Sequence, residues 1–304
     1  MPREKFGKGH DFLPKNEILT YEEIRNFVKA CKPLGLRKVR ITGGEPLLRH
    51  DLHHLVRQLS AMEMEVALTT NGSLLENNAA NLAQSGLSRV TISLDAIDQE
   101  VHSKITDSKV PVIDILDGIS AATRYELGPV KVNCVVQRGV NEHQIPKLVR
   151  KFRGTGVIVR FIEFMDVGST NGWTQGQVVP TSEIIDFLSS EFDLTPLARK
   201  SASDVASRWA HSDGSGEIGF ISSVSQPFCG DCVRARLSSD GKFFTCLFTT
   251  IGHDMSALIR SGGNTEGLTL SIEEVWSARK DRYSEERSSG AISLPRLEMS
   301  YIGG

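Results

Sequence analysis

The sequence has no long apolar segment and almost no net charge. No apolar run approaches the roughly 18 residues that a membrane span needs, and the opening segment MPREKFGKGHDF lacks the apolar core of an export signal. We therefore predict a cytoplasmic protein that is not in a membrane. A formal net charge of −2 gives no reason to expect nucleic acid as a partner.

Cysteine is scarce, with five residues in 304. An odd number of cysteines in a reducing compartment argues against a disulfide framework and favours metal binding or buried thiols. Three of the five, Cys229, Cys232 and Cys246, follow the spacing C-x2-C-x13-C. These three are the candidate metal ligands.

The first half of the chain alternates apolar runs with stretches of helical period. The predicted strands are 37–42, 66–70, 89–95, 130–136 and 157–164. Strands separated by helices form parallel sheets covered on both faces, or barrels. Five units are too few for a closed eight-fold barrel, so we predict a parallel α/β sheet or partial barrel.

Capping residues in the sequence also predict where two helices begin. Thr20 and Glu23 form a capping-box pattern before the first helix, and Asp51 is placed to cap the next.

The second half loses this alternation. A short helix is expected at TSEIIDFL, and Asp-Gly turns predict hairpins around HSDGSGEIGF and SSDGKF. We predict two regions: a (βα) sheet region over 1–168 and a mixed α+β region over 169–304.

The second hairpin bears on the cysteines. A turn at 239–241 would place Cys246 opposite residues 232–235, so that the three thiols meet. An iron–sulfur cluster with three thiolate ligands leaves one iron open to a substrate. Two alternatives remain: unrelated buried thiols, or a zinc site completed by His211 or His253.

Two arginines accompany the cysteines. In an extended strand, Arg234 and Arg236 would lie on the same face as Cys232. Arginine suits bidentate phosphate binding, although paired arginines are often merely a solvated basic strand. Beside metal-spaced cysteines we favour the ligand-binding interpretation.

Polar segments also end three of the predicted strands. Gly43 and Gly44 precede Glu45, whose carboxylate could accept from an ammonium group, and TTNG (69–72) and ISLD (92–95) end later strands. The carboxyl ends of parallel strands are where such folds bind ligands, although the GGEP segment could also be only a turn that starts a helix.

The combined motifs resemble a known family. ITGGEPLLR, LTTNG, SLDAID, VKVNCVVQRGVN, RFIEFMDVG, SVSQPFCGDCVRARLSSDGKFFTCLF, IRSG, DRYSEER and the terminal YIGG are similar to the GTP 3′,8-cyclases of molybdenum cofactor biosynthesis, which are radical S-adenosylmethionine (SAM) lyases. The resemblance implies a partial (βα)6 TIM-like barrel of the radical SAM type, missing its first strand, with a C-terminal mixed α+β region carrying a second iron–sulfur site.

The resemblance also implies roles for individual residues. The implied [4Fe–4S] ligands are Cys229, Cys232 and Cys246; the implied GTP contacts are Arg40, Thr69, Lys131, Arg234, Ala235 and Arg236, with Lys38 and Arg160 as weaker candidates. Gly44, Ser93 and Met165 match SAM-contacting positions, and Gly303 and Gly304 match a terminal pair that reaches into the active site. Each also has a plain structural interpretation: core methionine, strand-end hydroxyl or frayed tail.

One departure from the family matters. Family members carry a C-x3-C-x2-C loop that binds a second, radical-generating [4Fe–4S] cluster, and no such motif occurs in this sequence. We therefore expect the chain as printed not to form the radical. Either a start at an internal methionine, which we favour, or a truncation would account for this, and the codons upstream of Met1 would distinguish them.

Two classes of function follow. One is the family cyclase, with GTP as substrate, an electron donor, and a downstream cyclic pyranopterin monophosphate synthase as functional partner. The other is a non-catalytic GTP-binding module with one iron–sulfur cluster or a zinc ion. The oligomeric state, a homodimer included, is not determined by the sequence.

Overall fold

The structure is a computed structural model and describes residues 13–168, 170–201, 203–262, 264–287 and 297–303; Gly304 and the segment MPREKFGKGHDF lie outside the described residues. A large sheet and a small one organise the chain. The large sheet has the order β1-β2-β3-β4-β5-β8-β7-β6, and the small one the order β11-β10-β9.

The strands of the large sheet are β1 Lys38–Ile41, β2 Glu65–Thr70, β3 Arg89–Ser93, β4 Lys131–Val136, β5 Ile158–Glu163, β6 Leu194–Leu197, β7 Ser207–His211 and β8 Glu217–Ile221. The five predicted strands of the first half are confirmed as β1 to β5, each to within two residues at either end. They pair in parallel and in sequence order, and β8 joins β5 in parallel. Strands β6 and β7 extend the sheet antiparallel, through the hairpin predicted at HSDGSGEIGF.

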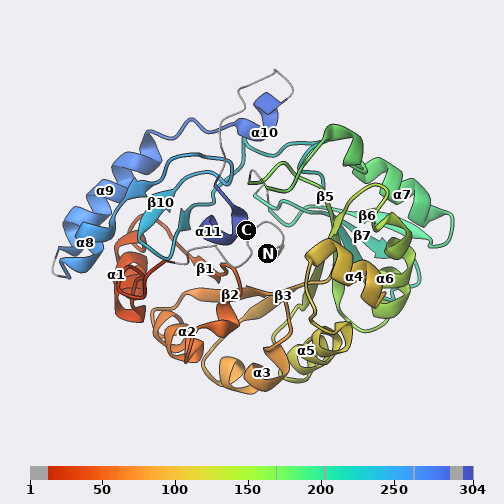
Figure 1. Ribbon diagram of the computed structural model, residues 1–304, viewed down its shortest axis with the longest axis horizontal. Helices are drawn as coiled ribbons and strands as arrows, with labels where there is room; N and C mark the ends of the chain where they lie inside the picture. The colour runs from red at the N-terminus through yellow and green to blue at the C-terminus, as the bar shows by residue number, and fades with distance from the viewer. Residues whose placement is uncertain (1–12, 169, 202, 263, 288–296, 304) are drawn as a thin grey trace.

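Helices cover the convex face of this sheet (Figure 1). They are α2 Leu52–Ser60, α3 Leu75–Gln84, α4 Gln99–Thr106, α5 Val112–Arg124, α6 Ile145–Phe152 and the predicted α7 Thr181–Ser189, with short 3-10 turns η1 Pro46–Leu48, η2 Glu142–Gln144 and η3 Gln175–Gln177. The main core lies between these helices and the sheet, where side chains such as Val66, Leu68, Val90, Ile92 and Phe161 are fully or almost fully buried. The curved parallel sheet with outer helices is the predicted partial barrel.

The C-terminal region closes back on the start of the chain. Its elements are β9 Arg236–Leu237, β10 Lys242–Phe244, β11 His253–Asp254, α8 Ser256–Arg260, α9 Thr265–Ser277, α10 Tyr283–Glu286 and α11 Met299–Ile302. A second core joins α1, Tyr21–Cys31, to this region, with Phe27 packed against Phe243 at a ring-centroid distance of 5.8 Å. Figure 1 shows α11 inside the arc of strands. Whether residue 168 separates two domains stays a prediction.

Two local predictions have different outcomes. The capping box is confirmed: the Thr20 hydroxyl accepts from the Glu23 N–H at 3.2 Å, and Glu23 accepts from the Thr20 N–H at 2.7 Å. The Asp51 cap is wrong. Asp51 has a left-handed backbone with φ of 55°, so its carboxylate caps no helical N–H and instead lies 2.6 Å from His50 Nδ1.

The extended strand predicted to carry Cys232 and Arg234 is also wrong in part. The hairpin turn at SSDGKF is present, but only Arg236 and Leu237 pair with β10. Upstream of them the chain turns, and the Cys232 N–H donates to the Cys229 carbonyl at 3.1 Å. The turn takes these backbone groups out of the sheet ladder.

No helix in the described part of the chain is both long enough and apolar enough to cross a bilayer.

Gly118 of α5 provides a test of the helix packing around the barrel. A Cβ atom at this buried position would lie 2.5 Å from the Gly72 carbonyl oxygen and 3.1 Å from Leu75 Cβ. We expect Gly118→Ala to lower the free energy of unfolding by about 1–3 kcal/mol, although alanine is the better helix former. Urea unfolding measures this, with exposed Ser120→Ala on the same helix as the control. Equal stability of the two variants would contradict the close packing of α5 at Gly118 against the Gly72 carbonyl.

Candidate active site

The concave face of the sheet is polar and cationic. Successive side chains of a strand point to opposite faces, so the residues that alternate with the buried apolar ones share the face away from the helices. Strand pairing places on this face Lys38, Arg40, Glu65, Ala67, Thr69, Arg89, Thr91, Ser93, Lys131, Asn133 and Arg160. Five of these side chains are cations and one is an acid.

Neighbouring strands hold two of the arginines through neutral acceptors. Arg40 Nη1 donates to the hydroxyl of Thr69 at 2.9 Å and to that of Thr91 at 3.4 Å. The Nε of buried Arg160 donates to Asn133 Oδ1 at 2.9 Å. Neither contact neutralises the charge, so both guanidinium groups keep the capacity to bind an anion.

Glu65 is the acid among these cations. It lies 3.4 Å from the Lys38 ammonium and forms an ion pair with Arg89. Glu65, Arg89 and Asn133 were missed by sequence reasoning. The signal was available: in KVR, EVA, RVT and KVN, a polar residue stands beside an apolar valine with the period of a strand, and parallel pairing gathers these polar residues on one face.

The crowding of positive charge affects ionisation. Burial, together with the charges of Arg160, Arg89, Arg40 and Lys38, lowers the pKa of Lys131 to about 8. Burial, together with the charges of Arg40 and Arg89, lowers the pKa of Arg160 to about 10. Both shifts reflect burial first and the neighbouring positive charges second.

The three predicted cysteine ligands lie in one neighbourhood. The Cys229 thiol is close enough to Cys246 to contribute to its pKa shift, and the charges of Cys246 and Cys232 both act on the Arg236 guanidinium. Burial resists ionisation of Cys232, but the Arg234 N–H and the Arg279 guanidinium outweigh it and lower its pKa. Burial raises the pKa of Cys246. The remaining cysteines, Cys31 and Cys134, are buried in the cores.

The segment 229–246, which carries the three candidate ligands and the β9–β10 turn, is called the cysteine hairpin below. Its Arg234 is close enough to the cationic sheet face to affect the charge of Arg40 there. Burial, followed by the charges of Arg89 and Arg234, lowers the pKa of Arg40 on β1. The Arg234 guanidinium also lies 5.2 Å from the centre of the Phe228 ring. The fold therefore brings residues almost two hundred positions apart into one electrostatic neighbourhood. Ala235, between the two arginines, is exposed.

The strand-end segments are fixed by the Glu45 carboxylate. It accepts from the Thr70 hydroxyl at 2.7 Å, the Asn71 N–H at 2.7 Å and the Leu47 N–H at 3.0 Å. These bonds tie the GGEP turn to the end of β2; the predicted ammonium contact of Glu45 stays a prediction. Gly44 is exposed beside this turn.

The other predicted SAM positions follow later strands. Ser93 ends β3 with an exposed side chain, and partly buried Met165 follows β5, with its carbonyl accepting from Asn171 Nδ2 at 2.9 Å. No contact joins these two residues to each other or to Gly44 within the described contacts.

The predicted tail residue Gly303 is buried between the end of β1 and the cysteine hairpin. Its carbonyl accepts from Arg236 Nε at 3.1 Å, and a Cβ atom at this position would lie 2.6 Å from Thr42 Cγ2. With φ of 73°, the position favours glycine on backbone grounds as well.

Two family models match the sequence: the radical SAM superfamily over residues 6–152 and the molybdenum cofactor synthesis C-terminal family over residues 157–285. Proteins named GTP 3′,8-cyclase from Acidothermus cellulolyticus and Staphylococcus epidermidis are each 44% identical, over 100% of this chain and 91% of their own length. A third, from Xanthomonas axonopodis pv. citri, is also 44% identical with the same coverage. The chain belongs to the GTP 3′,8-cyclase family.

Solved structures agree with this family fold. Streptococcus suis SuiB is similar with a TM-score of 0.56 and 14% identity, over 86% of this chain and 63% of SuiB. The protein anSMEcpe, solved with AdoMet and a Cp18Cys peptide, gives a TM-score of 0.54 and 14% identity, over 96% of this chain and 86% of its own. At these identities the likeness shows the radical SAM fold alone. The family model, these neighbours and the parallel sheet confirm the predicted fold class.

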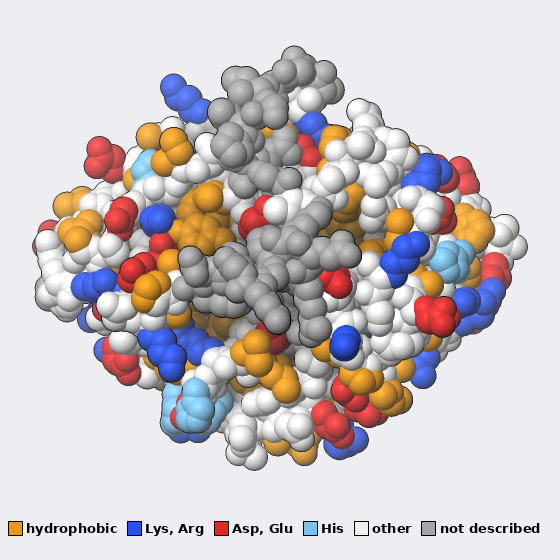
Figure 2. Space-filling model, viewed as in Figure 1, with side chains coloured by type: hydrophobic (Ala, Val, Ile, Leu, Met, Phe, Trp, Pro, Cys, Tyr) orange, Lys and Arg blue, Asp and Glu red, His pale blue; other side chains and the backbone are white. Residues whose placement is uncertain are grey.

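Figure 2 shows the face of the molecule seen in Figure 1, where acidic and basic side chains are interspersed around the rim. The rim seen in this view therefore shows no large patch of a single charge sign.

The low pKa of Lys131 is open to direct measurement. Because only the neutral amine reacts, we expect its acetylation by a water-soluble anhydride to rise with pH around a midpoint near 8 in the folded protein. In urea-unfolded protein the midpoint should move to about 10.4. Mass spectrometry of the Lys131 peptide measures both profiles. Coincident profiles would contradict the crowding of positive charge on the sheet.

Proposed function

We propose that this protein acts as a GTP 3′,8-cyclase, converting GTP to (8S)-3′,8-cyclo-7,8-dihydroguanosine 5′-triphosphate by SAM-derived radical chemistry in molybdenum cofactor biosynthesis. Family membership over the whole chain supports this. The single observation that carries it is that Arg234, beside the candidate cysteine ligands, lies within electrostatic reach of Arg40 on the cationic sheet face.

The cationic face is proposed to bind the triphosphate. Arg40, Lys131 and Arg234 supply charge, and the Thr69 hydroxyl orients Arg40 through a 2.9 Å hydrogen bond. A triphosphate would provide the negative charge that Glu65 alone does not. Arg236, Ala235, Lys38 and Arg160 are further candidates near the substrate. Guanidinium groups held by neutral partners are suited to bidentate phosphate contacts.

The cysteines are proposed to hold a [4Fe–4S] cluster. Three thiolates on a single tetrahedral zinc ion would lie about 3.8 Å apart. Among the described residues, however, only Asp51, His53 and His54 form a His, Cys, Asp or Glu trio with all ligand atoms within 4.8 Å of one another. The thiols of Cys229, Cys232 and Cys246 do not form such a trio, and a cluster accommodates thiolates that are further apart than a single zinc ion does. Zinc with His211 or His253 as the fourth ligand stays the alternative that metal analysis tests.

When bound by three thiolates, such a cluster offers an open iron to which a guanine could coordinate. The protein's part is to present the thiolates. The Arg234 N–H and Arg279 favour the ionised form of Cys232, and Arg279 Nη1 donates to the Cys232 carbonyl at 2.6 Å. These contacts orient the ligand loop.

The remaining roles follow from the family. Gly44, Ser93 and Met165 are proposed to contact SAM, and Gly303 to form part of the active-site wall; its predicted partner Gly304 lies outside the described residues. An electron donor and a downstream cyclic pyranopterin monophosphate synthase complete the proposed scheme. Turnover also needs the family's radical-generating cluster, whose C-x3-C-x2-C motif does not occur in the printed sequence, so we expect turnover only where that motif is supplied. The alternative function, a GTP-binding module without turnover, differs in chemistry but not in the binding site.

Cluster content and GTP binding test the assignment without depending on turnover. After anaerobic reconstitution, we expect Cys246→Ser to lose the iron bound by the hairpin, because one of three ligands is replaced by a poor one. Arg234→Ala should keep the iron but weaken GTP binding by about tenfold or more, the worth of one charge-assisted hydrogen bond. Iron and sulfide analysis and equilibrium dialysis with GTP give the two quantities.

Cys31→Ala is the control for the cysteine variant. Cys31 is buried at the end of α1, and burial raises the pKa of its thiol to about 12, so it should not ligate iron. A Cys246→Ser protein that retains full iron and full GTP affinity would contradict the proposed site. Stoichiometric zinc in place of iron, with GTP still bound, would favour the non-catalytic GTP-binding module over the cyclase.

Lys131 makes the triphosphate assignment specific. We expect Lys131→Met to weaken GTP binding by about tenfold or more but guanosine binding much less, because the lost partner is a phosphate. In the parent protein, GTP affinity should fall between pH 7 and 9 as the Lys131 ammonium, with its pKa of about 8, loses its proton. The variant should lose this part of the pH dependence in calorimetric titrations. Equal losses for GTP and guanosine would place the triphosphate elsewhere.

A further inference from the structure

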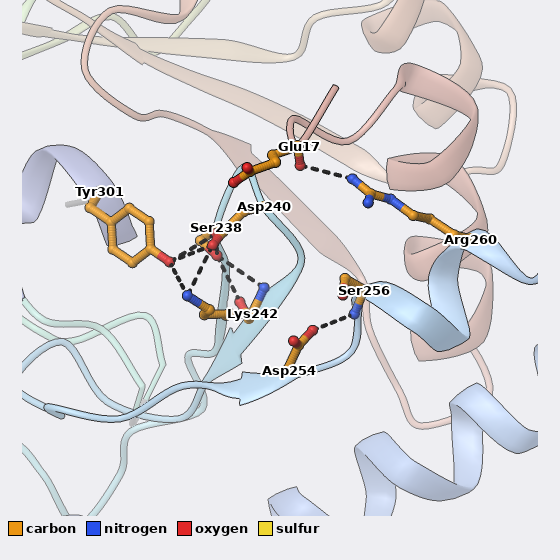
Figure 3. A network of polar contacts seen from close by, with 8 residues as sticks. All are labelled: Glu17, Ser238, Asp240, Lys242, Asp254, Ser256, Arg260 and Tyr301. Carbon is orange, nitrogen blue, oxygen red and sulfur yellow. Dashed lines mark hydrogen bonds and ion pairs between the residues drawn. The ribbon is translucent and has the colours of Figure 1, made fainter. Parts of the chain in front are cut away.

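The C-terminal helix α11 is held by a hydrogen-bonded cluster on the cysteine hairpin (Figure 3). We propose that Tyr301 is a positioning residue that fixes α11 on this hairpin, so that Gly303 forms one wall of the substrate site beside Arg236. The assignment of that wall to the substrate rests on the function proposed above.

Tyr301 makes the central contacts. Its hydroxyl lies 2.9 Å from Asp240 Oδ1 and 2.7 Å from Oδ2, and the Lys242 ammonium donates to it at 3.1 Å. The hydroxyl has a single proton, so it donates to the carboxylate and accepts from the ammonium. Both partners belong to the hairpin that leads to Cys246.

The carboxylate that receives Tyr301 is itself fixed. The Ser238 hydroxyl donates to Asp240 Oδ1 at 2.5 Å, and the Lys242 ammonium lies 3.1 Å from Asp240 Oδ2. Burial resists ionisation of Asp240, but the hydrogen bonds of Ser238, Tyr301 and Lys242 outweigh it and lower the pKa of Asp240. Hydrogen bonds from Tyr301 and Asp240 raise the pKa of Lys242. The ion pair of Asp240 and Lys242 thus provides both an acceptor and a donor for the Tyr301 hydroxyl.

The ring of Tyr301 adds packing to these bonds. It meets Phe244 of β10 edge-on, with ring centroids 6.2 Å apart and an interplanar angle of 83°. Phe244 is fully buried, one position before Thr245 and two before Cys246. Helix α11 comprises only Met299–Ile302, too short to be stable without tertiary contacts. Its place therefore depends on side-chain anchors such as this one.

The anchor determines where the chain goes next. Two residues after Tyr301, the Gly303 carbonyl accepts from Arg236 Nε at 3.1 Å, and the Gly303 N–H closes the helix by donating to Met299 at 2.9 Å. Arg236 is in turn within electrostatic reach of Cys232 and Cys246. A shift of α11 would move this carbonyl away from Arg236 and open one side of the cysteine neighbourhood.

Tyr301→Phe tests the inference because it keeps the ring packing and removes only the hydroxyl. In the reconstituted protein we expect amide exchange at Ile302 and Gly303 to become about tenfold faster or more, the worth of a hydrogen bond to a charged group. GTP affinity should fall about threefold or more, while iron content stays unchanged. The change in the cluster's electron paramagnetic resonance spectrum on adding GTP should also shrink.

Two further variants sharpen the test. Asp240→Ala should reproduce the effects of Tyr301→Phe at Ile302 and Gly303, and the double variant should add little there, because each single variant already removes the Tyr301–Asp240 hydrogen bond. Tyr125→Phe, at an exposed tyrosine, is the matched control and should change nothing.

Unchanged amide exchange at Ile302 and Gly303 in Tyr301→Phe would overturn the proposal, as would faster exchange with unaltered GTP affinity and spectrum. General acceleration of exchange throughout the protein would also overturn it, by showing a structural role only. Absence of GTP binding to the unmodified protein would instead count against the proposed function, and the local exchange result would still decide whether Tyr301 holds α11.

Discussion

The mutual repulsion of cations on one face of a parallel sheet is the constraint on which the site depends. Strand alternation forces the side chains between the buried apolar ones onto the concave face, and there Arg40, Arg89, Lys131 and Arg160 lie with Glu65 as the one acid that the pairing of β1 to β5 places among them. Burying charge in this way costs free energy. The apolar core on the other face offsets this cost, and a bound triphosphate, as proposed above, would offset it further.

Carboxylates fix the loops around that charged face. Glu45 joins the GGEP turn to the end of β2, and the fully buried Glu163 accepts from the N–H groups of Thr181 and Val224, each at 2.8 Å. Each of these two carboxylates accepts hydrogen bonds from backbone N–H groups that lie outside the strands and therefore have no partner in the sheet. The strand ends are thereby held rigid next to the positions proposed for SAM, as a preorganised site requires.

The C-terminal region completes the site from the opposite side. It supplies the cysteines, Arg234 and the Gly303 carbonyl, and it is attached through the core that joins α1 to α9 and β10. Because α1 precedes β1 directly, this attachment sets the distance between the cationic face and the cysteine hairpin. The site is thus defined by packing between the two ends of the described chain.

The sequence by itself determined the local features, because these depend on nearby residues: the five parallel strands, the capping box at Thr20, the hairpin turn at Asp240 and Gly241, and the three cysteines with their spacing. Two predictions from the sequence were wrong. Asp51 does not cap α2 with its side chain, because its backbone is left-handed, and the strand predicted through Cys232 is interrupted by a turn. Only the tertiary structure decided that Arg89 and Asn133 belong to the cationic face, that Arg234 comes within electrostatic reach of Arg40, and that Tyr301 donates a hydrogen bond to Asp240. Those relations depend on strand register and on contacts between distant segments, which arise only when the sheet curves and the chain closes on itself.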